Sequence, residues 1–137
     1  MKAMATILSY YVLFLGIALI VLCIIQLLIP KRVYTLWKKW ISHRFFRIHG
    51  AVIILGGLPL TVFRDGIAGK IMFCIGIFVV FMGPFILFFP NKMRDLYIRT
   101  ESDLEEGDKK GIIYFDAITR GISGAIFVYT IYYYGTF

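Results

Sequence analysis

The stretch from Ala3 to Ile29 contains no charged residue. As an α-helix it would measure roughly 40 Å, which is enough to cross a hydrocarbon core of about 30 Å. Over the whole chain 60% of the residues are apolar and 17% are charged, whereas soluble domains have about 45–50% and about 25%. The apolar residues fall into blocks of this kind. They predict an all-α membrane protein with four transmembrane helices, at about 4–29, 48–64, 69–89 and 112–134.

The basic residues predict the orientation of these helices. Of the 15 lysines and arginines, most lie in the segments that follow the first and third apolar blocks. Lys2, Arg64 and Lys70 flank the opposite ends. Because short basic loops stay in the cytoplasm, we expect 30–47 and 90–111 to be cytoplasmic and both termini to be periplasmic. The expected location is the bacterial inner membrane, with 91–110 as a polar loop.

The chain divides into two similar two-helix units, 1–66 and 67–137. In each unit the first helix stops at a proline, Pro30 or Pro90, because proline lacks the amide needed to continue a helix. A basic segment follows, and glycines lie near the start of the second helix. Since each unit crosses the membrane twice, the two copies are expected to be parallel repeats.

This pattern resembles the small YjeT-like family of bacterial inner-membrane proteins of unknown function, which typically have one such unit. The matching residues are Pro30 and Lys31 in the first copy and, in the second, Gly83, Pro90, Asp116, Arg120 and Gly124. His43 stands in the first copy where the aspartate belongs, although Arg47 keeps the spacing. Leu22 and Met82 replace the acidic residue that the family often has late in its first helix. The resemblance implies a tandem duplication and brings no activity with it.

Residues 31–46 have an apolar face and a basic face at helical spacing, which predicts an amphipathic helix in the membrane interface. Tyr34, Trp37, Trp40 and Tyr97 are the expected aromatic anchors. The basic face is a candidate surface for anionic lipid or an acidic partner, with anchoring alone as the alternative: it comprises Lys31, Arg32, Lys38, Lys39, Arg44 and Arg47. Nucleic acid is not an expected partner, because cytoplasmic placement of basic loops accounts for most of the net charge of +7.

Asp116 and Arg120 are four residues apart in the last apolar block, so they share one face of a helix and can form an ion pair. Ionisable residues inside a membrane span are costly unless they are paired. The pair is therefore either a structural contact or a proton-handling site. Small residues in the second and fourth blocks predict close helix packing, at Gly50, Gly56, Gly57, Gly121 and Gly124.

No nucleophile, metal cluster or haem pair stands out, and Cys23 and Cys74 lie singly in apolar stretches. We therefore expect no enzymatic activity, no metal and no cofactor. The primary hypothesis is a non-catalytic accessory or assembly subunit of a larger inner-membrane complex, with anionic lipids and other membrane subunits as partners. The alternative is a small transporter or lipid-handling protein that uses Asp116 and Arg120.

Overall fold

The computed structural model describes residues 2–134. Met1 and 135–137, for which a periplasmic location is predicted, lie outside the described residues. The described chain is helical and contains no β-strand, which confirms the all-α fold class. Its elements are α1 (Lys2–Leu28), α2 (Pro30–Ser42), α3 (Phe46–Gly57), the 3-10 helix η1 (Leu58–Val62), α4 (Gly66–Phe88), α5 (Pro90–Ser102) and α6 (Glu106–Tyr134).

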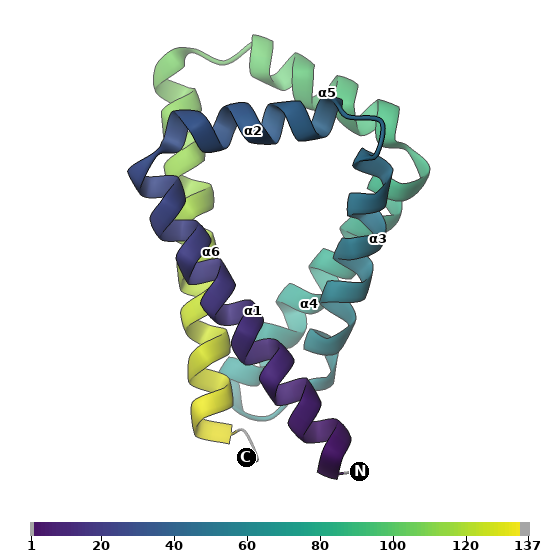
Figure 1. Ribbon diagram of the computed structural model, residues 1–137, viewed down its shortest axis with the longest axis vertical. Helices are drawn as coiled ribbons and strands as arrows, with labels where there is room; N and C mark the ends of the chain where they lie inside the picture. The colour runs from purple at the N-terminus through teal and green to yellow at the C-terminus, as the bar shows by residue number, and fades with distance from the viewer. Residues whose placement is uncertain (1, 135–137) are drawn as a thin grey trace.

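The helices form a triangular frame (Figure 1). In the first leg, α1 packs along α6; in the second leg, α3 and η1 pack along α4. The legs meet at a narrow end, where α1 begins and α6 ends, and they diverge toward a wide end. At the wide end α2 and α5 run across from one leg to the other. The first leg therefore pairs helices that are distant in sequence. The second leg pairs consecutive helices that are joined at the narrow end.

Three helices are long and apolar enough to cross a membrane: α1, α4 and α6. The fourth predicted span, 48–64, coincides with α3 and η1, which together follow α2 at a bend of 106°. The α-helix changes to a 3-10 helix at Leu58, next to Pro59, which has no amide N–H for the regular pattern. By length and composition the protein thus has three segments able to span a membrane, or up to four if the bent pair is one span.

Prolines begin both crossing helices. Pro30 and Pro90 occupy the first turns of α2 and α5, and the residues before them, Ile29 and Phe89, leave the helical conformation, with φ of −132° and −126°. The residue before a proline is sterically disfavoured in the α region, which explains both breaks. Residues 91–110, expected to be a polar loop, are instead mostly helical as α5 and the start of α6. The sequence pattern missed α5 because only a narrow apolar side, with Met93 and Tyr97, packs inward.

Glycines bring the backbones of each leg into contact. A Cβ added at Gly124 would lie 2.6 Å from the carbonyl oxygen of Gly16, so α1 and α6 touch there. In the second leg, a Cβ at Gly50 would lie 2.7 Å from the carbonyl oxygen of Gly83, and Gly57 lies against α4 beside Gly76. Of the other predicted packing glycines, Gly56 accepts a hydrogen bond of 2.9 Å from the Tyr11 hydroxyl, and a Cβ at Gly121 would lie 2.8 Å from Cys23 Sγ.

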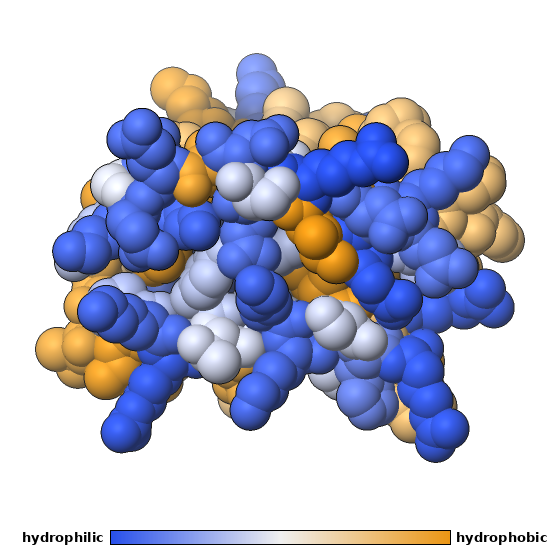
Figure 2. All heavy atoms as spheres, turned by 90° about the horizontal axis from the view of Figure 1, so that it is seen from above, coloured by the Kyte–Doolittle hydropathy of each residue, from blue (hydrophilic) through white to orange (hydrophobic). Residues whose placement is uncertain are grey.

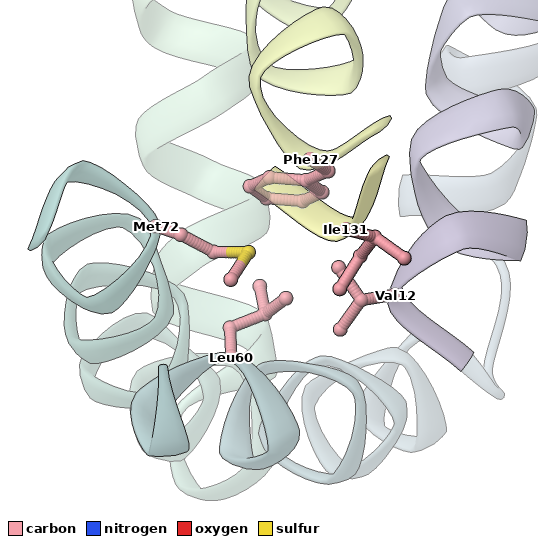
Figure 3. Close-up of a cluster of buried hydrophobic side chains, with 5 residues drawn as sticks. All are labelled: Val12, Leu60, Met72, Phe127 and Ile131. Atoms are coloured by element: carbon pink, nitrogen blue, oxygen red, sulfur yellow. The ribbon is translucent and has the colours of Figure 1, made fainter. Parts of the chain in front are cut away.

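The two legs are joined at the narrow end by a cluster of buried apolar side chains (Figure 3). It draws on α1, η1, α4 and α6, through Val12, Leu60, Met72, Phe127 and Ile131. All five are almost completely buried. We call this set the apex cluster. The legs diverge from the apex cluster (Figure 1). By joining them at one end, the cluster determines where the crossing helices and the space beneath them lie.

Gly124→Ala should destabilise the protein by about 1–3 kcal/mol, because the new methyl group meets the backbone of α1 and the helices must separate. Gly111→Ala is the matched control on the same helix, since a Cβ there meets nothing within 4 Å. It should be neutral or stabilising by up to about 1 kcal/mol, as alanine favours helix. Thermal unfolding in detergent measures both; equal shifts for the two variants would contradict the close contact.

Candidate functional site

A buried polar side chain from α1 organises the wide end of the first leg. Gln26 is only 6% exposed and lies in the apolar second half of α1. Its Nε2 donates hydrogen bonds to the carbonyl oxygen of Ile113, at 3.1 Å, and to Oδ2 of Asp116, at 2.9 Å. A buried amide without partners is costly, so these two bonds tie α1 to α6 at this level. Sequence reasoning missed Gln26, although a lone glutamine in an uncharged span of this length was a visible clue.

Asp116 and Arg120 form an ion pair on α6. Arg120 Nε donates to Oδ2 of Asp116 at 2.9 Å, on the oxygen that also accepts from Gln26. The side chains remain 45% and 37% exposed, respectively. Within residues 2–134, the two terminal nitrogens of Arg120 have no hydrogen-bond partner. The carboxylate thus orients the guanidinium and leaves its outer donors for another group.

These side chains line a cavity of about 700 Å³ beneath α2. Its walls are mostly apolar, and Gln26, Asp116 and Arg120 form a hydrogen-bonded polar group in the wall. The other lining residues come from α1, α2, the segment after α2, α5 and α6: Leu22, Ile25, Val33, Tyr34, Leu36, Trp37, Lys39, Trp40, His43, Tyr97, Ile112 and Ile113. Apolar walls with a few converging polar groups are the usual composition of a small-molecule binding site.

The four predicted aromatic anchors, Tyr34, Trp37, Trp40 and Tyr97, all line this cavity. The two tryptophans also surround His49 of α3, with ring centroids 5.4 Å from it for Trp37 and 6.2 Å for Trp40. The aromatic side chains of α2 therefore line the cavity and pack against α3.

Polar contacts hold α2 against α5 at the wide end. Lys38 Nζ donates to Glu101 Oε1 at 2.9 Å. Arg94 caps the end of α2, since Nε donates to the carbonyl oxygen of Ile41 at 3.0 Å and a terminal nitrogen donates to that of His43 at 3.3 Å. We call these contacts the crossing ties. The crossing ties join α2 to α5, and these two helices run in opposite directions across the wide end (Figure 1).

The predicted basic face is divided by this arrangement. Lys38 belongs to the crossing ties, and Lys39 lines the cavity. Lys31 and Arg32 are exposed on α2, whereas Arg44 and Arg47 lie beyond its end, around the start of α3. Viewed from the wide end, the surface is largely hydrophilic, with apolar patches between the polar side chains (Figure 2). Within the described 133-residue range 2–134, no three histidine, cysteine or carboxylate side chains are placed to share a metal ion.

Comparison of the chain with protein-family models, curated proteins and solved structures finds no match. The resemblance to the YjeT-like family stays a prediction.

Acid should weaken the crossing ties. The hydrogen bond from Lys38 holds the pKa of Glu101 below its ordinary value of 4.5. Because the folded-state pKa is the lower one, this stabilisation is complete above about pH 4.5 and is lost as the pH falls below it. It amounts to at most about 1 kcal/mol, since Lys38 is half exposed.

The difference in unfolding temperature between neutral and acidic pH measures this effect. Glu101→Gln should show a smaller difference than the native protein, and Glu105→Gln, on an exposed residue next to α6, is the matched control. An unchanged pH dependence in Glu101→Gln would exclude the carboxylate as its source.

Proposed function

We propose that this protein is a four-span membrane protein, built from two interlocked copies of one unit, that binds a membrane lipid in the cavity of its first leg. Each copy comprises a first span, a crossing helix and a second span. Each leg then combines the first span of one copy with the second span of the other. The proposal assigns α2 and α5 to the cytoplasmic surface and involves no chemical step.

Regular spacings support the duplication. In the first half of each unit, equivalent residues are 60 positions apart: Pro30 and Pro90 begin the crossing helices, and Gly16 and Gly76 lie at the leg contacts. In the second spans the spacing is 67, which relates Gly57 to Gly124. The apex cluster follows both spacings, since it pairs Val12 with Met72 and Leu60 with Phe127. The spacing of 67 residues relates Asp116 to His49, whereas the sequence pattern suggested His43 as its equivalent.

The difference between the two legs carries the functional proposal. The positions equivalent to Gln26, Val33, Ile113 and Arg120 in the second leg are Ile86, Met93, Phe46 and Ile53. These larger or apolar residues pack together with Ile41 into a closed cluster. In the first leg the corresponding place is an open cavity of about 700 Å³ whose wall includes Gln26, Asp116 and Arg120. One leg thus has a cavity where the other has a packed core.

The chemistry of the cavity favours an amphipathic occupant. Apolar side chains such as Leu22, Ile25 and Val33 offer contact to an acyl chain, and the outer nitrogens of Arg120 offer donors to a polar group. The proton-handling alternative has less support, because Gln26 and Arg120 both already donate to the same oxygen of Asp116. Asp116 therefore orients the guanidinium of Arg120, which lines the cavity.

The accessory-subunit role expected from the sequence stays a prediction. The exposed apolar side chains of α1, α4 and α6 suit contact with lipid and with another membrane helix equally.

Filling the cavity should prevent lipid binding. The protein has two tryptophans, and both line the cavity. When small amounts of brominated phospholipid are added to the protein in detergent, tryptophan fluorescence should therefore be quenched, and the quenching should saturate. Ile113→Phe introduces the residue found at the equivalent position of the second leg and should reduce this quenching several-fold. Ile122→Phe, on an exposed residue of the same helix, is the control. Unsaturable quenching that is the same in all three proteins would contradict a lipid site.

Labelling of single cysteines tests the proposed topology. In a background with Cys23→Ala and Cys74→Ala, Asp65→Cys lies in the turn between η1 and α4, and Glu105→Cys lies between α5 and α6. A membrane-impermeant maleimide added to intact cells should label the first and not the second, because only the narrow-end turn is expected outside. Labelling of Glu105→Cys alone would invert the topology; labelling of both or neither would contradict the single membrane crossing that α4 makes between the two sites.

A further inference from the structure

A second hollow lies on the second leg, away from the cavity. It occupies about 360 Å³ between the start of α3 and the start of α5, and it shares no lining residue with the cavity. Three arginines surround it, Arg44, Arg47 and Arg94, together with Phe45, Ile48, Pro90 and Asn91. We call it the arginine notch. No carboxylate lines it, although the neighbouring crossing ties contain one.

One arginine of the notch is fixed and the other two are available. Arg94 is held by the carbonyl oxygens of Ile41 and His43 at the end of α2. The guanidinium of Arg44 lies 4.8 Å from the ring centroid of Phe45 and makes no hydrogen bond or ion pair within residues 2–134, and the same absence holds for the side chain of Arg47 in that range. Three like charges gathered without a counter-charge repel one another. An anion bound between them would remove that repulsion.

Two helix ends add to the positive potential of the notch. Arg47 and Ile48 belong to the first turn of α3, and Pro90 and Asn91 to the first turn of α5. Neither helix has a side-chain cap at its N-terminus. In the first turn of α3 the amides of Phe46 and Ile48 already donate to backbone carbonyl oxygens, and Pro90 has no amide hydrogen. The two helix ends therefore favour an anion through their partial positive charge.

The surroundings of the notch indicate a lipid rather than a soluble phosphate. Phe45 and Ile48 line it and are about half exposed, as is Phe89 just before α5. A phosphate between the arginines would thus have bulky apolar side chains beside it, which can contact an acyl chain. Basic pockets beside membrane helices recognise anionic head groups in this way. A choline or ethanolamine head group would bring an ammonium ion toward three arginines.

We propose that the arginine notch binds the phosphate of an anionic phospholipid, such as phosphatidylglycerol, in the leaflet next to α2 and α5. It holds the head group, while the acyl chains lie against the second leg. This site is separate from the cavity and does not depend on a lipid being bound there.

Native mass spectrometry of the delipidated full-length protein tests the site. Phosphatidylglycerol and phosphatidylcholine with the same acyl chains are titrated in detergent, and the notch should retain phosphatidylglycerol selectively. Arg44→Gln/Arg47→Gln should weaken this binding about thirtyfold, the factor expected for the loss of two charge contacts of this kind. Arg94 is left intact because it caps α2.

Lys31→Gln/Arg32→Gln is the matched control, since it removes two exposed charges from the same side of the molecule. It should leave the selectivity unchanged. An equal loss in both double variants would mean general attraction between the basic face and anionic lipid, and would overturn the notch, as would no loss in either.

Two further measurements separate the notch from other sites. Arg120→Gln alters the cavity and should not change phosphatidylglycerol retention; if it removes retention while the double arginine variant does not, the lipid lies in the cavity and the notch proposal fails. Inorganic phosphate should compete only weakly with the lipid. Competition by phosphate at concentrations similar to the lipid would identify a soluble phosphate site instead.

Discussion

The contact between helix backbones at glycines is the constraint on which the rest of the structure depends. Gly16 against Gly124 and Gly50 against Gly83 allow two pairs of helices to approach until the carbonyl oxygen of one glycine leaves no room for a Cβ on the other. In a membrane, where lipid is as apolar as leucine, such packing is a main source of helix association. Each pair becomes a stiff leg, and the apex cluster then fixes the legs at one end.

Divergence of the legs creates the features that concern function. Away from the apex cluster the two legs diverge (Figure 1), and α2, α5 and their crossing ties span the wide end. In the second leg, Phe46, Ile86 and Met93 fill the space under the crossing helices. In the first leg, smaller and polar residues leave a cavity. The proposed duplication and the proposed lipid site thus have a common physical basis, which is unequal filling of two equivalent spaces.

Much of the helical content followed from the sequence pattern. Uncharged blocks and the prolines at 30 and 90 indicated where long helices end. The cost of burying a charge and the missing amide of proline are properties of each residue and do not depend on distant parts of the chain. The ion pair between Asp116 and Arg120 followed from their spacing on one helix. The helix α5 did not, since its inward apolar side is narrow, with Met93 and Tyr97, and polar sequences of this kind resemble loops.

The sequence by itself determined that the chain forms long apolar helices, that prolines separate them from polar crossing segments, and that two opposite charges share a face of α6. These properties are local, because they depend on the hydration of each side chain and on bonds between near neighbours. Only the tertiary structure decided that α1 packs on α6, that Gln26 reaches Asp116, and that three arginines from two segments surround one notch. Such contacts join residues far apart in the chain, and they exist only where the glycine contacts let the helices meet.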